Sequence, residues 1–145
     1  MKNNRSSCPL TSALDIIGDK WSLLIIRDIF LGKKTFTEFL NSGEKIATNI
    51  LSNRLELLTS CGLLMVTKMP YDQKTKIYYL TDSGIDMYPV IYEMMRWSER
   101  NLKKKFGPLG MELLNSFQKK SADKVITEAT CKYRVTREEI LSKIN

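Results

Sequence analysis

Four side chains with hydrogen-bonding groups lie close together in one stretch of the sequence: Thr48, Asn49, Ser52 and Asn53. Their spacing places them on one side of an α-helix, opposite an apolar side. An Asn amide can pair bidentately with adenine, and Ser or Thr can bond either kind of base edge. This helix face therefore suits the reading of DNA bases. The residues alone leave an ordinary solvated face equally open, although such a face more often carries Glu and Lys.

Three basic residues near this helix are candidates for contacting phosphate. Arg54 falls by helical phase between the apolar Leu51 and Leu55. It therefore either pairs with a carboxylate or binds a phosphate, since a guanidinium suits both. Lys74 and Lys76 lie in a predicted hairpin, where they are either phosphate contacts or plain solvated lysines. We interpret all three as candidate DNA-binding residues.

Cys8 lies just before the first predicted helix. A thiol near a helix N-terminus can have a lowered pKa, which makes Cys8 a candidate sensor of oxidants or electrophiles. The alternative is a packing role, because free cysteines are usually small buried apolar residues. With Cys61 and Cys131 the chain has three cysteines at long spacings and no CxxC, so neither a disulfide framework nor a zinc site is predicted. Reduced thiols indicate a cytoplasmic protein.

Composition argues against catalysis. The chain has no histidine, which removes the usual Ser-His-Asp, Cys-His and His-zinc arrangements. We therefore predict no enzyme activity, no metal and no cofactor. The net charge of +7 and the pI near 9.3 favour a polyanionic partner. The apolar run Leu23–Ile26 is too short to span a bilayer and no export signal is recognisable, so we expect no membrane span. By charge alone, either nucleic acid or an anionic membrane surface could be that partner; our prediction of double-stranded DNA and no membrane rests on the order of the elements given below.

The 145 residues fall within the size range of one domain, and their apolar spacing predicts helices followed by a hairpin. Thr35 and Glu38 have the spacing of a capping box, which begins a short third helix. Met69 to Thr75 separates two β-rich runs, so we expect a hairpin loop longer than two residues. The predicted helices are 10–18, 20–31, 36–41 and 46–61, and the predicted strands are 63–68 and 76–80.

The chain after the hairpin is expected to be helical. Thr81 can cap a last long helix, which Pro89 should kink or restart. Beyond an interruption at 106–108, an apolar stripe covers 109–117 and a weaker helix opens at Thr136.

A three-helix core followed by a hairpin is the order of a winged helix-turn-helix, so the predicted fold class is mainly α (α+β) with a two-stranded wing and dimerising terminal helices. In such a unit the second helix of the pair enters the DNA major groove. The polar face of residues 48–53 is on that helix, and Lys74 and Lys76 are on the wing. The order of the elements therefore favours DNA binding.

A set of short motifs follows the same order: Cys8-Pro9, Gly18-Asp19-Lys20-Trp21, Phe36-Thr37-Glu38-Phe39, Leu51-Ser52-Asn53-Arg54-Leu55 and Tyr78-Tyr79-Leu80-Thr81. Together they resemble the HxlR family of bacterial winged-helix regulators over about residues 8–106. The resemblance implies a homodimeric cytoplasmic transcription regulator, often a repressor, with N-terminal and C-terminal helices forming the dimer. In some members a cysteine at the position of Cys8 senses oxidants or electrophiles. We divide the chain into an HxlR-type winged-helix domain, 1–106, and a C-terminal helical extension, 107–145.

The helix that carries the polar face departs from the family pattern at its start. Family members often have Ser there, followed by Gln or Lys, where this chain has Ala47, Thr48 and Asn49. Without a hydroxyl at the cap, the helix is expected to start at Thr48 instead. The operator sequence therefore cannot be copied from relatives.

The last long helix is too apolar for the exposed helix of a monomer, which favours a dimer interface over a cofactor site. The predicted function is a sequence-specific DNA-binding transcriptional regulator, a repressor that binds a pseudo-palindromic operator as a homodimer and answers to a small-molecule or oxidant effector. The alternative is a winged-helix module that binds protein partners without reading DNA. The predicted dimer residues are Leu14, Ile17, Tyr92, Met95 and Trp97.

Overall fold

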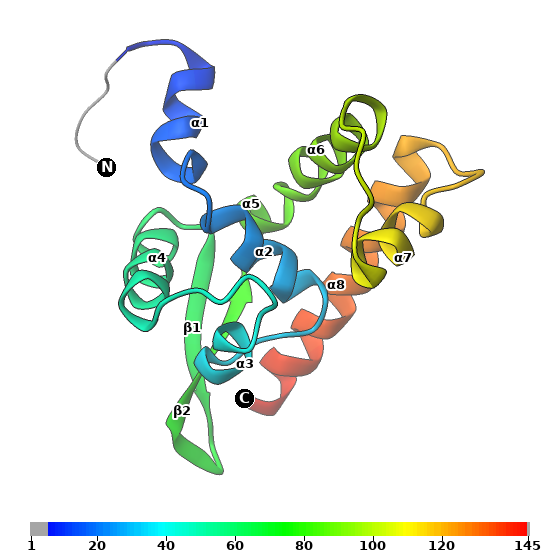
Figure 1. Ribbon diagram of the computed structural model, residues 1–145. Coiled ribbons are helices and arrows are strands. Elements are labelled where there is room, and N and C mark those ends of the chain that lie inside the picture. The colour runs from blue at the N-terminus through cyan, green and yellow to red at the C-terminus, as the bar shows by residue number, and fades with distance from the viewer. Residues whose placement is uncertain (1–5, 145) are drawn as a thin grey trace.

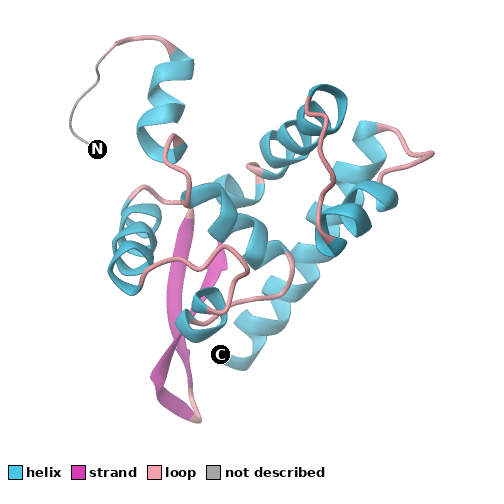
Figure 2. Ribbon diagram, in the orientation of Figure 1, coloured by secondary structure: helices cyan, strands magenta, loops and turns pink. Residues whose placement is uncertain are grey.

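The computed structural model describes residues 6–144. Along this part of the chain the elements are α1 (Pro9–Ile17), α2 (Ser22–Phe30), α3 (Phe36–Leu40), α4 (Thr48–Ser60), β1 (Leu64–Met69), β2 (Asp72–Leu80), α5 (Asp82–Ile85), α6 (Tyr88–Asn101), α7 (Pro108–Ser116) and α8 (Ala122–Ile144). Figure 1 shows the β1–β2 hairpin projecting beside α4, with α8 running along the other side. Figure 2 shows helices on both sides of the upper part of the antiparallel pair of strands, while the turn end of the hairpin projects below them. The predicted winged-helix fold is confirmed.

The core lies where α2, α4 and the root of the hairpin meet. Ile26 of α2, Leu51 and Leu58 of α4, and Leu64 and Leu80 of the strands are all completely inaccessible. Burying an aliphatic side chain of this size stabilises the fold by roughly 1.5–3 kcal/mol. The apolar α2 therefore occupies the centre of the molecule, as its composition predicts.

Polar side chains fix the starts of α2 and α3. The Oδ1 atom of Asp19 accepts hydrogen bonds from the N–H groups of Trp21 and Ser22 at 2.7 and 2.8 Å. Helix α2 consequently begins at Ser22, two residues later than expected. The capping box is confirmed at α3, where Thr35 and Glu38 each accept a backbone hydrogen bond from the other.

The turn between α3 and α4 is tied to α2 by an ion pair. Arg27 donates from its two Nη atoms to the two carboxylate oxygens of Glu44, at 2.9 and 3.0 Å. The Ser42 hydroxyl donates to the same carboxylate at 2.6 Å. This network holds the turn that sets the position of α4.

The Arg27–Glu44 pair predicts an acid dependence of stability. The hydrogen bond from Arg27 is the largest of the effects that lower the pKa of Glu44 from 4.5 to about 2. Because this folded-state pKa is depressed, the stabilisation is fully present above pH 4.5 and is lost as the pH falls to about 2. Urea unfolding at about pH 6 and about pH 3 should show that Glu44→Gln loses less stability on acidification than the wild type. The exposed Glu112→Gln serves as control, and equal losses in all three proteins would contradict the prediction.

The hairpin differs from the expectation of a long loop. Its turn has only two residues, Pro70 and Tyr71, and β2 begins at Asp72. Met69 pairs with Asp72 while Lys68 pairs with Lys76, so the intervening residues of β2 bulge out of register. The Asp72 carboxylate stabilises this bulge by accepting from the N–H groups of residues 74 and 75. The prediction was wrong because polar residues that suit a loop here form a bulged strand.

The chain beyond the hairpin follows the expectation at Pro89 and departs from it at Thr136. Thr81 caps the short α5, and Pro89 lies in the first turn of α6, so the helix restarts as predicted. No helix begins at Thr136, which lies inside the continuous α8. The buried residues of α8, Val125, Tyr133 and Ile140, recur at nearly heptad spacing, and their packing overrides the local capping signal.

The C-terminal residues pack on the winged helix. Tyr133 of α8 belongs to the same buried cluster as Ile26 of α2 and Leu51 of α4. The division of the chain near residue 106 stays a prediction. Among residues 6–144, no helix combines the length and the apolar character needed to cross a membrane.

Candidate nucleic-acid interface

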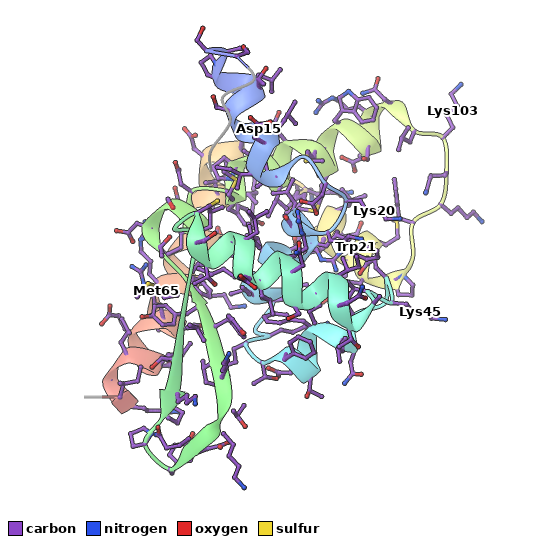
Figure 3. All side chains as sticks on the ribbon, turned by 90° about the vertical axis from the view of Figure 1, so that its left-hand side faces the viewer. Asp15, Lys20, Trp21, Lys45, Met65 and Lys103 are labelled. Atoms are coloured by element: carbon purple, nitrogen blue, oxygen red, sulfur yellow. The ribbon has the colours of Figure 1, made fainter. Side chains whose placement is uncertain are left out.

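Helix α4 has one buried and one exposed side. Leu51, Leu55 and Leu58 face the core. The four predicted base-reading residues, Thr48, Asn49, Ser52 and Asn53, are all exposed. The helix begins at Thr48 after an extended Ala47 without a side-chain cap, as the missing hydroxyl implies. Figure 3 shows α4 lying across one face of the molecule, with Lys45 at its N-terminal end and the hairpin extending away below it.

A groove of about 860 Å³ opens between α4 and the hairpin. It is lined by Ser52 of α4 and by Lys74 and Lys76 of β2, so the structure brings these predicted residues together. Asn49 and Asn53 are not part of its lining. A concave surface with a polar helix on one side and lysines on the other suits a duplex whose phosphates are held by the wing.

The groove contains polar residues that the sequence analysis did not single out. Thr37, Glu56 and Thr59 line it together with the predicted residues. Thr59 lies seven positions after Ser52, so helical spacing alone could have identified it. A carboxylate such as Glu56 can accept a hydrogen bond from cytosine but repels phosphate. The groove therefore presents a carboxylate as well as two ammonium groups to a ligand.

Arg54 pairs with a carboxylate. Its Nη1 atom lies 3.1 Å from Oδ2 of Asp19, which precedes α2. The Arg54 side chain is 24% exposed and stays close to the core. Burial alone would raise the pKa of Asp19, but hydrogen bonds from Ser22, Trp21 and Arg54 together lower it below its usual value. Of the two interpretations of Arg54, the structure supports the carboxylate partner.

Arg54 also determines which atoms of Asn53 are available. Its Nε and Nη2 atoms donate to Oδ1 of Asn53 at 3.2 and 2.5 Å. Because a guanidinium only donates, the amide must turn its oxygen towards Arg54 and its NH₂ group outward. Asn53 therefore offers two donors to a ligand, whereas the Asn49 amide is not engaged within the described chain and offers both a donor and an acceptor.

Lys74 and Lys76 are exposed on the bulged part of β2. The structure records no ion pair for either side chain among the described residues. The hydrogen bond from the Lys74 N–H to Asp72 fixes the backbone of the bulge and does not involve the ammonium group. Both ammonium groups are available to an anionic partner.

Cys8 is exposed and lies at the N-cap of α1. Hydrogen bonds from the backbone N–H groups of Thr11 and Leu10 lower the pKa of the Cys8 thiol, and the largest effect comes from Thr11. An accessible thiol with a lowered pKa fits the reactive alternative better than the packing one. Cys131 is also exposed, and Cys61 is half-buried.

The five predicted dimer residues divide into two groups. Leu14 of α1 and Trp97 of α6 are 48% and 53% exposed, and Met95 is half-buried. Ile17 and Tyr92 are buried within the single chain, which leaves little of their surface for a partner. Tyr92 is covered because it packs edge-to-face on Phe117, with ring centroids 5.0 Å apart. Residues far apart in the sequence make this contact, so helical spacing alone does not predict it. Met94, which belongs to the same apolar part of α6 as Met95 and Trp97, is 56% exposed.

The fold and the groove place this chain in the class of winged helix-turn-helix proteins. The family described as HxlR-like helix-turn-helix matches residues 16–106. The chain belongs to the HxlR-like helix-turn-helix family, as the motifs suggested. Residues 107–145 lie outside this match.

Relatives and solved structures agree with this assignment. The chain is 35% identical over 99 residues to the HTH-type transcriptional regulator Rv3095 of Mycobacterium tuberculosis, and the match covers 66% of this chain and 60% of Rv3095. The chain therefore spans about 60% of the length of that relative. The crystal structure of PA1607 has a TM-score of 0.63 and 36% identity, covering 72% of this chain and 70% of that one.

The transcriptional regulator YodB of Bacillus subtilis is a further structural relative. Its reduced form has a TM-score of 0.57 and 28% identity, covering 70% of this chain and all of YodB. Structures of YodB treated with diamide and bound to quinone also resemble this chain, each with a TM-score of 0.53.

Proposed function

We propose that this protein is a sequence-specific DNA-binding transcriptional regulator that acts as a homodimer, represses its target and binds a pseudo-palindromic operator. The observation that carries the proposal is the groove, because it places Ser52 of α4 beside two exposed lysines of the wing, while the neighbouring Thr48, Asn49 and Asn53 of the same helix are exposed outside its lining. Its relatives are HTH-type transcriptional regulators, which supports the same function. A dimer bound to its operator prevents other proteins from binding the same DNA. Repression therefore needs no further surface on this protein.

The exposed face of α4 and the wing have separate tasks in this proposal. Helix α4 enters the major groove, where Asn49 reads adenine with its donor and acceptor and Asn53 donates to base acceptors. Lys74 and Lys76 bind phosphates and carry no sequence information. The net charge of +7 adds long-range attraction to the duplex.

Selection from a pool of random double-stranded DNA tests the proposal. A two-fold dimer should select a pseudo-palindrome whose half-site centres lie about 34–36 Å apart. Affinity should fall steeply with salt, because phosphate contacts release counterions. Selection of single or tandem half-sites would contradict the two-fold operator. Weak binding without salt dependence would favour the alternative function, a module that binds proteins.

The dimer is predicted to form through α1 and α6. Trp97→Glu should give a monomer by light scattering at micromolar concentration, because it places a charge in the exposed apolar surface of α6. Val135→Glu is the matched control, since Val135 is likewise an exposed apolar residue, 61% exposed, but lies on α8. A wild-type protein that is already monomeric, or a dimer that survives Trp97→Glu, would contradict the proposal.

Cys8 is proposed as the oxidant-responsive residue. Diamide removes two electrons and two protons from two thiols, forming an intersubunit disulfide or a mixed disulfide with an added thiol. Operator binding by the wild type should fall after diamide treatment and recover after addition of a reductant. The Cys8→Ser variant should keep its binding throughout, while Cys131→Ser should behave like the wild type, although both thiols are exposed. Loss of binding in Cys8→Ser would return Cys8 to a packing role.

A further inference from the structure

Strand β2 has an outer edge that does not pair with β1, and helix α8 occupies its end. The N–H group of Leu80 donates to the Tyr133 hydroxyl at 2.9 Å, and Nη1 of Arg137 donates to the Leu80 carbonyl oxygen at 3.2 Å. Both backbone groups of this residue are therefore held by α8. Leu80 is the last residue of the wing and pairs with Leu64 across the hairpin. Helix α8 thus holds the root of the wing by hydrogen bonds.

The two side chains that hold Leu80 are themselves well fixed. Tyr133 is 3% exposed, and its ring packs edge-to-face on Phe30 of α2 with centroids 5.3 Å apart. Arg137 also forms an ion pair with Asp82 at 2.9 Å. The Nε atom of Arg137 is buried without a hydrogen-bond partner, the only such side-chain atom among the described residues. Leaving a buried donor unsatisfied is costly, which indicates that the Nη contacts determine where this guanidinium sits.

A second contact lies farther along the hairpin. Ile140 of α8 packs with Met69 and Ile77 in a buried cluster of its own, and Tyr79 and Ile144 pack against that cluster. Met69 and Ile77 lie on the two strands, directly before the turn and after the bulge. Figure 1 shows α8 running beside the hairpin from its root. Helix α8 therefore supports the wing at its root and close to the bulge that carries the lysines.

We propose that Tyr133 and Arg137 are positioning residues for DNA binding: they hold the wing so that Lys74 and Lys76 reach phosphates while α4 lies in the major groove. This inference rests on the proposed function. An isolated two-stranded hairpin is only marginally stable in water, so the direction of the wing has to be set by what packs against it. Both residues lie outside the stretch that matches the family, which ends at residue 106. The C-terminal helix therefore adds to the support that the core gives the wing, where Leu64 and Leu80 are buried and the Tyr78 N–H donates to the Lys34 carbonyl oxygen at 2.8 Å.

The test is a double-mutant cycle between the α8 contacts and the wing lysines. Tyr133→Phe removes only the hydroxyl, and Arg137→Met removes the donors to Leu80 while keeping most of the side-chain length. Each is combined with Lys74→Ala/Lys76→Ala, and binding to the selected operator and to a random duplex is measured across a range of salt concentrations. Arg134→Met is the control, because it removes the same charge from an exposed position on α8.

The α8 variants should bind both DNAs about tenfold more weakly, and their salt slope should fall by roughly one to two phosphate contacts. In the Lys74→Ala/Lys76→Ala background, Tyr133→Phe and Arg137→Met should have little further effect on binding, because the phosphate contacts that Tyr133 and Arg137 position are already gone. Arg134→Met should keep the wild-type salt slope, apart from its small effect on overall charge.

Two results separate the failure of this inference from that of the proposed function. A wild type that shows no salt-dependent DNA binding overturns both. Salt-dependent binding by the wild type, together with effects of Tyr133→Phe and Arg137→Met that add fully to those of the lysine substitutions, overturns the positioning role alone. The positioning role also fails if these variants lower only the melting temperature and leave the salt slope unchanged, since a purely structural contact would do that.

Discussion

Replacing Lys74 and Lys76 together by alanine is expected to weaken binding to every DNA duplex by a similar factor. The two ammonium groups are exposed and without ion-pair partners in the described chain, so their full charge is available to phosphate. Each lost phosphate contact should reduce the slope of log K against log salt by about 0.9, or roughly 1.8 for both. The expected loss of affinity is about 10- to 100-fold at moderate salt. Titrations of the selected operator and a random duplex at several salt concentrations measure both quantities.

The control for this prediction removes two lysines elsewhere. Lys124 and Lys143 are exposed on α8, so Lys124→Ala/Lys143→Ala lowers the net charge by the same amount. Its effect should be limited to a small general weakening, with a nearly unchanged salt slope. If the two double variants behave alike, net charge rather than the wing governs binding. If the wing variant loses affinity only for the operator, the lysines take part in base recognition and the division of tasks in the groove is wrong.

The helices of the core could be predicted because their signals are local. The capping box of Thr35 and Glu38 and the apolar spacing of Leu51, Leu55 and Leu58 each lie within a few residues, and the structure contains both as expected. The same holds for Pro89, which has no N–H to donate, so it disrupts a helix interior and fits the first turn, where α6 has it. Local signals of this kind sufficed to predict a winged helix and the exposed face of α4.

Features that depend on contacts between distant residues could not be predicted. Arg54 meets Asp19 across 35 positions, and this contact decides which atoms of Asn53 face solvent. Tyr92 is buried because Phe117 packs on it, and Leu80 is bonded by a tyrosine 53 positions later. The spacing of residue types along the sequence does not indicate which distant residues will be in contact. The atoms presented by a binding surface, and the support behind the wing, became visible only in the folded chain.

The length of the hairpin turn could not be predicted from the sequence for a different reason. Asp72 suits a turn by composition, and it does accept hydrogen bonds from following N–H groups as a turn residue would. In the structure those bonds stabilise a bulge inside β2, after a turn at Pro70 and Tyr71. One residue type therefore serves both structures, and only the pairing of Lys68 with Lys76 distinguishes them.

Asn49→Ala is expected to lower affinity for the selected operator by roughly 1–3 kcal/mol while leaving binding to random DNA nearly unchanged. The reason is that the Asn49 amide, unengaged within the described chain, can pair bidentately with adenine, and alanine removes both hydrogen bonds at once. Asn53→Ala should have an effect of the same kind. Asn115→Ala, an exposed change on α7, is the control and should affect neither DNA. Equal losses on operator and random DNA would remove either asparagine from base reading.

The two asparagines should nevertheless prefer different bases, because Arg54 occupies Oδ1 of Asn53 and leaves only its NH₂ group to face a ligand. A group with donors alone fits the two acceptors of guanine, O6 and N7, better than the donor and acceptor of adenine. Repeating the DNA selection with Arg54→Met should shift the base opposite Asn53 from guanine towards adenine, since the amide is then able to turn. The base opposite Asn49 should stay the same, which provides an internal control within one experiment. Because the substitution also leaves Asp19 without its guanidinium partner, the melting temperature is measured alongside. If a folded Arg54→Met protein selects an unchanged site, the Arg54 contact does not set the specificity of Asn53.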